Sequence, residues 1–280
     1  MNYFLGIHCG HDATATLIDE NGNIIASVAE ERITRVKYHA GFPYESIFEV
    51  LRHGDISPNQ IKYIGSSTKR LFHPQSEWMN SYLLSKDLEL KKQYDISNLP
   101  KFESRLKKLG RVVGSKIQST KSFSNEEIEL FSDELVLKTL KSIGFHDFTF
   151  SSFDHHLCHS ASAYFCSGQQ DSLIITMDGA GDGKCATAAI INDGQIQVLS
   201  SASSSCSPGR FYSEITRFLG YKRNRHEGKI TGLAAYGDPH KYFSDLKQFM
   251  AFDPEKEHFV WNMPAESGLK RKLKTAKRIL

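Results

Sequence analysis

The sequence lacks the features that mark membrane-spanning, secreted and disulfide-linked chains. Its 280 residues contain no apolar run near the roughly 18 residues that a membrane-spanning helix needs. The start, MNYFLGIHCGHDA, has no basic segment followed by a long apolar one, so we expect no signal peptide. No two cysteines form a CxxC pair, which argues against a disulfide framework or a cysteine zinc site and favours reduced thiols in the cytoplasm. The five cysteines are Cys9, Cys158, Cys166, Cys185 and Cys206.

Most of the chain also lacks a strong excess of positive or negative charge. The formal net charge is +3, but residues 270–280, KRKLKTAKRIL, hold six Lys and Arg; the rest has 29 basic and 32 acidic residues. Because a nucleic-acid surface would depend on this one segment, we expect neither a nucleic-acid nor a membrane partner. With 40% hydrophobic and 24% charged residues, the composition is that of an ordinary globular chain with a sizeable core.

What the sequence does contain is a repeated strand pattern. Residues 3–31 read as a strand, a polar turn, a strand, an Asn-Gly hairpin and a third strand. Residues 171–203 repeat this order with DGAGDG as the polar turn. The repeat predicts two related α/β lobes facing each other across a cleft, a first lobe at 1–167 and a partial second lobe at 168–280.

The remaining segments predict helices and strands that complete these lobes. Residues 73–147 are rich in Lys, Glu, Ser and Leu, with helical periodicity near 80–90, 103–112 and 125–143, and predict a mostly helical insertion. The other predicted elements are helices over 44–54, 155–167 and 208–221, strands over 61–67 and 148–153, and a helix and strand within 241–262.

Two histidines in FDHHLCHSASAYF (153–165) stand at helical spacing. His155 and His159 are four residues apart, so both lie on one helix face about 6 Å apart, and Asp178 ends a later strand. Two imidazoles and a carboxylate could hold one divalent ion. Helix histidines more commonly pack in a core or pair with a carboxylate, and the spacing alone leaves both readings open.

Two polar turns also carry residues that could do chemistry. DGAGDG (178–183) could bring backbone N–H groups to a phosphate, or it could be a tight hairpin; it is neither a Walker A loop nor GxGxxG. GHDAT (10–14) places His11 and Asp12 in the first turn. A histidine there could act as a general base near neutral pH or be a plain turn residue.

Basic residues follow two of the predicted elements. EERITRVKYHAGFP (30–43) carries Arg32, Arg35 and Lys37, which could contact an anionic substrate or form a solvated edge. Lys229 lies between two glycines, where it could contact a phosphate or be an exposed loop lysine.

Five segments in order resemble the N-terminal domain of the O-carbamoyltransferase family, which includes nodulation protein U, cephem carbamoyltransferases and tobramycin carbamoyltransferase. The resemblance is strong over residues 1–67 and 148–240 and weak in the middle. The segments are GIHCGHDATATLI, EERITRVKYHAGFP, DHHLCHSASAYFCS, MDGAGDG and HEGKITGLAAYGDP.

This resemblance implies a fold and an activity. The fold is the actin-like ATPase fold of two ribonuclease-H-like lobes, with mixed sheets, antiparallel strand meanders and flanking helices. The activity is transfer of a carbamoyl group from carbamoyl phosphate, through an ATP-dependent carbamoyl-adenylate, to an acceptor hydroxyl. The acceptor would be a small molecule such as a sugar, a nodulation factor or an antibiotic-like compound.

The resemblance also assigns roles to residues. It implies a divalent metal, Fe²⁺ or else Zn²⁺ or Mn²⁺, on His155, His159 and Asp178, with His156 pointing away. His11, with Asp12, falls on the position of the catalytic base for the acceptor hydroxyl. The residues implied near nucleotide phosphate or anionic substrate are Gly179, Gly181, Asp182, Gly183, Lys229, Arg32, Arg35 and Lys37.

Family members are about twice as long as this chain. The resemblance therefore implies an incomplete second lobe, a further aspartate ligand, adenosine-binding glycines and a YrdC-type domain that a second chain or a homodimer partner would supply. Two alternatives remain open here: a non-catalytic remnant or partner subunit, and an actin-fold kinase or ATPase acting on a small molecule.

Overall fold

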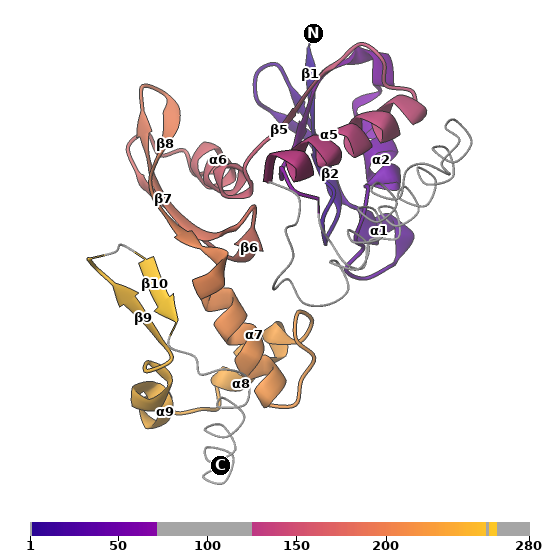
Figure 1. Cartoon of the computed structure of the whole chain (residues 1–280). Helices are drawn as coiled ribbons and strands as arrows, with labels where there is room; N and C mark the ends of the chain where they lie inside the picture. Colours follow the sequence, from indigo (N-terminus) through magenta and orange to yellow (C-terminus); the bar gives the residue numbers. More distant parts are fainter. Residues whose placement is uncertain (1, 72–124, 256–257, 262–280) are drawn as a thin grey trace, which may run out of the picture. The chain divides into compact units, whose positions relative to one another are not determined.

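The computed structural model describes residues 2–71, 125–255 and 258–261 (Figure 1). Contacts divide the chain into two compact units, 1–154 and 155–280. No helix in the described parts is long and apolar enough to cross a membrane. The predicted helices near 80–90 and 103–112 and the basic run at 270–280 fall outside the described residues.

The first unit is built on one five-stranded mixed sheet. Its spatial order is β3-β2-β1-β4-β5, with β2 antiparallel to its two neighbours and β4 and β5 running parallel to β1. This order, with a single antiparallel strand in second place, is that of a ribonuclease-H-like domain, so the predicted fold class is confirmed. The strands are β1 (Tyr3–His8), β2 (Thr14–Asp19), β3 (Ile24–Ala29), β4 (Ile61–Ser66) and β5 (Thr149–Ser152).

Two helices form one core with this sheet. Alternate residues of β1, Leu5 and Ile7, are buried in the same cluster as residues of α2 (Tyr44–Gly54) and α5 (Asn125–Ser142). Each such buried side chain contributes roughly 1.5–3 kcal/mol. The opposite face of the sheet exposes Phe4, whose ring stacks on that of Tyr63 with 5.0 Å between the ring centres.

Helix α5 corrects the predicted insertion at 73–147. Val136 and Leu140 of α5 belong to the core, and the helix connects β4 to the parallel strand β5. Residues 125–142 are therefore the crossover helix of the lobe, which a parallel pair of strands requires. The rest of the predicted insertion, 72–124, lies outside the described residues.

A buried glutamate fixes the start of α2. Strand β3 ends at Ala29, and Glu30 opens the short helix α1 (Glu30–Thr34) instead of extending the strand to residue 31 as predicted. Glu30 is 1% exposed, and its carboxylate accepts the backbone N–H groups of Glu45 at 3.0 Å and Ser46 at 2.7 Å. These donors have no partner within the helix, so Glu30 caps α2 through its side chain.

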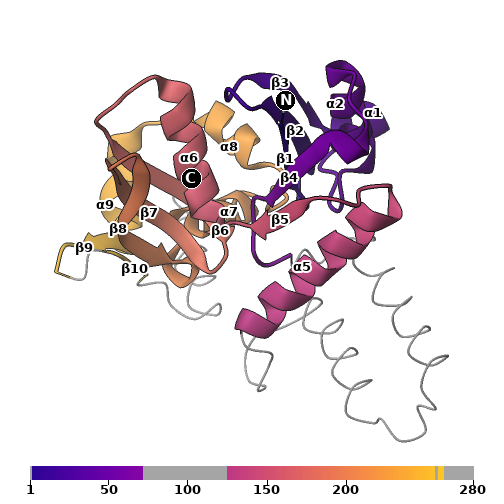
Figure 2. The same cartoon turned by 90° about the horizontal axis from the view of Figure 1, so that it is seen from above.

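The second unit contains a three-stranded antiparallel sheet, in the order β6-β7-β8. Helix α6 (His155–Ser167) packs on all three strands (Figure 2), so it belongs to this unit and not to the first lobe, where the predicted boundary at 167 placed it. The other elements of this unit are β6 (Leu173–Gly181), β7 (Lys184–Asn192), β8 (Gln195–Ser203), α7 (Pro208–Phe218), α8 (Glu227–Ala234), α9 (Pro239–Leu246), β9 (Met250–Asp253), β10 (His258–Trp261) and the short 3₁₀ turn η3 (Ser204–Cys206). A second 3₁₀ turn, η1 (Pro58–Gln60), precedes β4 in the first unit.

The predicted repeat is present in the backbone. Strands β6, β7 and β8 follow one another as β1, β2 and β3 do. In each unit the turn between the first and second strand holds an aspartate in the left-handed region, Asp12 with φ 59° and Asp182 with φ 46°. Asp193 and Gly194, both with positive φ, form the predicted hairpin turn between β7 and β8.

Candidate metal centre

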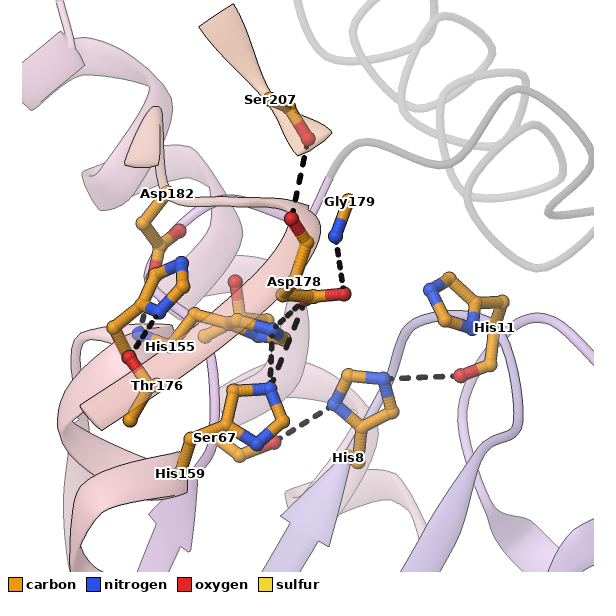
Figure 3. A network of polar contacts seen from close by, with 12 residues as sticks. His8, His11, Ser67, His155, His159, Thr176, Asp178, Gly179, Asp182 and Ser207 are labelled. Atoms are coloured by element: carbon orange, nitrogen blue, oxygen red, sulfur yellow. Dashed lines mark hydrogen bonds and ion pairs between the residues drawn. The ribbon is translucent and has the colours of Figure 1, made fainter. Parts of the chain in front are cut away.

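Helix α6 and strand β6 bring three ligand-type side chains together (Figure 3). His155 and His159 lie on one face of α6 in its first two turns, and Asp178 lies near the end of β6, on which α6 packs. His155 Nε2 is 2.8 Å from Asp178 Oδ2 and 2.9 Å from His159 Nε2, and His159 Nε2 is 3.7 Å from the same carboxylate oxygen. The two histidines and Asp178 therefore converge as predicted.

Hydrogen bonding explains this convergence only if one N–H of His155 is shared between Asp178 and His159. If His155 Nε2 carries the hydrogen that it donates to Asp178, it has no lone pair with which to accept a hydrogen from His159 Nε2. A cation satisfies all three atoms at once. The point equidistant from them lies about 1.9 Å from each, so all three atoms would be within reach of one ion at the usual Zn–N distance of about 2.1 Å. The set has the chemistry of a two-histidine, one-carboxylate site.

The DGAGDG turn holds His155 in place. The Asp182 carboxylate accepts a hydrogen bond from the backbone N–H of His155 at 2.9 Å and so caps the N-terminus of α6. A Cβ built on Gly181 would overlap the ring of His155, whereas one built on Gly179 would meet no atom within 4 Å. The imidazole therefore lies directly against the backbone at Gly181, a close approach that only glycine allows.

Asp178 is oriented by its own turn and by the start of α7. Gly179 donates its N–H to Asp178 Oδ1 at 2.5 Å, and the hydroxyl of the fully buried Ser207 donates to the Asp178 carbonyl at 3.2 Å. The hydrogen bonds from His155 and His159 hold the pKa of Asp178 well below its usual range, against the opposing effect of its partial burial. The carboxylate is thus ionised, the form that binds a metal.

His156 lies apart from the other two histidines, as predicted. Its ring is fully buried, and Nδ1 shares a 2.7 Å hydrogen bond with Thr176 Oγ1, which bonds in turn to Thr187. Burial lowers the pKa of His156, so the ring is neutral and part of the core between α6 and β6.

His11, to which the resemblance assigns the role of base, lies beside Asp12 in the first unit. His11 Nδ1 is 2.9 Å from Asp12 Oδ2, and the two side chains are 66% and 51% exposed. A carboxylate at Nδ1 fixes the tautomer in which Nε2 has the lone pair, as a general base requires. The backbone pairs His11 with Ala40, which ties this turn to the loop after α1.

The predicted anion-binding residues lie on exposed segments. Arg32 is in α1, Arg35 is the left-handed residue that ends that helix, and the ammonium of Lys37 lies 5.2 Å from the centre of the Tyr38 ring. Lys229 lies in the first turn of α8, a helix and not a loop, and its side chain is exposed. In the DGAGDG turn, Gly183 has a φ of 86° and closes the hairpin.

Sequence reasoning missed one polar pair. His8 Nδ1 lies 2.7 Å from Ser67 Oγ (Figure 3). His8 ends β1 and Ser67 follows β4, and these strands are parallel neighbours in the sheet. The signal that could have found the pair is that polar residues at the carboxyl ends of adjacent parallel strands meet at one sheet edge.

Fold and site together define an α/β protein of the ribonuclease-H-like class with a clustered His, His and Asp set. The sequence model described as "Carbamoyltransferase N-terminus" matches residues 3–277. The chain belongs to that family of transferases, and the resemblance noted in its motifs is confirmed.

Relatives of known sequence show the same similarity. An uncharacterized protein of Methanocaldococcus jannaschii, MJ1058, is 27% identical over 91% of this chain and 45% of its own length. Nodulation protein NolNO of Sinorhizobium fredii is 27% identical over 85% of this chain and 30% of its own length. Nodulation protein NolO of Bradyrhizobium diazoefficiens is 38% identical over 34% of this chain and 17% of its own. This chain thus spans less than half of each of these relatives.

Among solved structures, YeaZ from Pseudomonas aeruginosa is similar at a TM-score of 0.32 and 10% identity, over 72% of this chain and 65% of that one. A likeness at this level supports no argument, and the fold assignment rests on the strand order of the first unit.

Proposed function

We propose that this chain is the N-terminal part of an O-carbamoyltransferase that passes a carbamoyl group to a hydroxyl of a small molecule. The donor is carbamoyl-adenylate, made from carbamoyl phosphate and ATP. Family membership supports carbamoyl transfer in general. The observation that supports a working site in this chain is the convergence of His155, His159 and Asp178 within bonding reach of one ion.

The three side chains would hold a divalent ion, Fe²⁺ or else Zn²⁺ or Mn²⁺. Bound there, the ion would supply Lewis acidity to a carbonyl or phosphate oxygen of the donor. The protein's own contribution is orientation. Asp182 and Gly181 position His155, and Ser207 positions the backbone at Asp178, in the way that outer contacts fix metal ligands.

His11 is assigned to the acceptor hydroxyl. Asp12 holds Nδ1–H, so Nε2 can take the proton as the hydroxyl oxygen attacks the carbamoyl carbon. Asp12 stabilises the imidazolium that results. Backbone N–H groups of Gly179, Gly181 and Gly183, with Lys229, Arg32, Arg35 and Lys37, are the proposed contacts to the anionic donor.

The first test is metal content, measured by mass spectrometry on the purified chain and on His155→Ala/His159→Ala. The matched control is His53→Ala/His146→Ala, which removes two exposed histidines from the first unit. We expect near-stoichiometric Fe, Zn or Mn in the wild-type chain and the control, and loss in the first variant. Equal metal in all three proteins would contradict the assignment of the centre.

The second test follows the carbamoyl group. Carbon-labelled carbamoyl phosphate, ATP and a panel of sugars are incubated with the chain, alone and together with the C-terminal half of NolNO. Label on a sugar hydroxyl that is lost in His11→Gln supports the proposal. ATP hydrolysis that needs no carbamoyl phosphate and leaves no label on any hydroxyl overturns it in favour of a kinase or ATPase.

A further inference from the structure

The ends of β1 and β4 form a second polar constellation in the first unit. The strands run parallel with Ile7 opposite Ser66, and the backbone N–H of Ser67 donates to the Ile7 carbonyl at 3.1 Å. This bond continues the ladder one residue past β4 and sets Ser67 beside His8. Carboxyl ends of parallel strands are the edge at which α/β sheets bind ligands.

The hydrogen bonds of His8 fix which nitrogen carries the proton. Nε2 is 3.0 Å from the carbonyl oxygen of His11, and a carbonyl can only accept, so Nε2 is the N–H donor. In the neutral ring Nδ1 therefore has the lone pair. The 2.7 Å contact then runs from the Ser67 hydroxyl to Nδ1, with the hydroxyl as donor. The side chain of His11 takes no part in this, because His8 bonds to its backbone.

The surroundings hold the His8 ring in place. A Cβ built on Gly10 would come within 2.6 Å of His8 Nε2, so the ring lies against the backbone of the turn. That turn is tied down by a 3.2 Å bond from Gly41 N–H to the Gly10 carbonyl. His8 and Ser67 are each half-buried, so the pair is partly shielded from water and still reachable by a small molecule.

A hydroxyl bonded to an imidazole that a third group orients is the arrangement that activates a serine nucleophile. We propose that Ser67, with His8 as its base, accepts an acyl group from an activated ester or mixed anhydride. The pair uses neither the candidate metal ligands nor the side chain of His11, and the proposal does not depend on the proposed transfer reaction.

The step balances within the pair and the substrate. Ser67 Oγ forms a bond to the carbonyl carbon, and its proton passes to His8 Nδ1. The bond from that carbon to the leaving oxygen breaks, and the leaving group takes the proton from His8. Ser67 is left as an O-acyl ester, which water or another hydroxyl can then cleave.

The test uses the whole chain with p-nitrophenyl acetate, a simple activated ester, and with acetyl phosphate, a mixed anhydride. Intact mass and peptide mapping locate the acetyl group, and release of p-nitrophenol gives the rate. We expect one acetyl group on Ser67, none at that position in Ser67→Ala, and a rate lower by about a hundredfold in His8→Gln, which removes the general base. Circular dichroism checks that each variant is folded.

Ser27 is the matched control, because it is a more exposed serine of the same sheet whose hydroxyl bonds at 2.7 Å to Thr16 and to no imidazole. Ser27→Ala should label as the wild-type chain does. Acetylation that is no faster at Ser67 than at Ser27, or an unchanged rate in His8→Gln, overturns the proposal. Mapping of the wild-type chain and His8→Gln decide the question even if Ser67→Ala does not fold.

Discussion

The glycine against which His155 lies provides a sharp test of the metal centre. Gly181 has a backbone conformation that alanine can adopt, since its φ is not in the left-handed region, so Gly181→Ala adds a methyl group without backbone strain. That methyl would overlap the His155 ring and would lie 2.7 Å from its Cβ. Because the overlap involves the root of the side chain as well as the ring, the imidazole has to move.

Displacement of His155 should weaken binding of the ion about as much as the loss of a contact that orients a metal ligand usually does. We expect metal affinity to fall about 10- to 100-fold, which corresponds to about 1.4–2.7 kcal/mol of binding free energy. Competition with a chromophoric chelator for Zn²⁺ or Mn²⁺ measures this directly. Thermal unfolding without metal, run on the same samples, separates lost affinity from lost stability.

Gly179→Ala is the control, since it lies two residues away in the same turn and its added methyl would meet nothing within 4 Å. Its affinity should match that of the wild-type chain. An unchanged affinity in Gly181→Ala, or an equal loss in both variants, would refute the argument that the backbone at residue 181 positions the ligand.

Three other predictions follow from contacts outside the ligand set. Glu30→Ala leaves the first N–H groups of α2 without their acceptor, so we expect a loss of about 2–3 kcal/mol in urea unfolding. Ser207→Ala removes both the hydroxyl that caps Arg210 N–H at the start of α7 and its hydrogen bond to the Asp178 carbonyl. We expect calorimetry to show a loss of about 1 kcal/mol in the free energy of unfolding together with a lower metal affinity. Burial raises the pKa of Asp133, so this native carboxyl holds its proton more tightly than the unfolded one, and its contribution to stability is lost as pH rises through that pKa. The stability of Asp133→Asn relative to the wild-type chain should therefore be higher at pH 7 than at pH 3. Urea midpoints that show the opposite trend would contradict this prediction.

Local signals in the sequence were enough for the strand meanders. The Asn-Gly and Asp-Gly turns and the alternating residues of β1 to β3 and β6 to β8 depend on neighbours a few positions away. The assignment of α5 to an insertion was wrong for the opposite reason. Val136 and Leu140 belong to one core cluster with residues of β1 and β4, which are far away in sequence, and the polar residues around them obscure the apolar face of the helix.

The clustering of the three candidate ligands was foreseen in part. Helical spacing put His155 and His159 on one face, and its place at the end of a strand made Asp178 a possible third ligand. The resemblance to a family then assigned all three residues to one metal. The structural supports were not foreseen, because Asp182 reaches the start of α6 across a turn and Gly181 matters only through what lies against it. The pairing of His8 with Ser67 depends on the register of two parallel strands, which no local pattern encodes.

The left-handed aspartates at 12 and 182 limit how this protein can diverge. Glycine, asparagine and aspartate are the residues that adopt a φ near 50–60° at least cost, so these three are the preferred choice at either position. Within that choice, Asp12 in the first copy of the turn pairs with an exposed histidine, and Asp182 in the second caps the helix that carries the two candidate ligands. The same backbone conformation thus supports two different side-chain contacts. Substitution by glycine at either position would remove the contact and leave the turn intact.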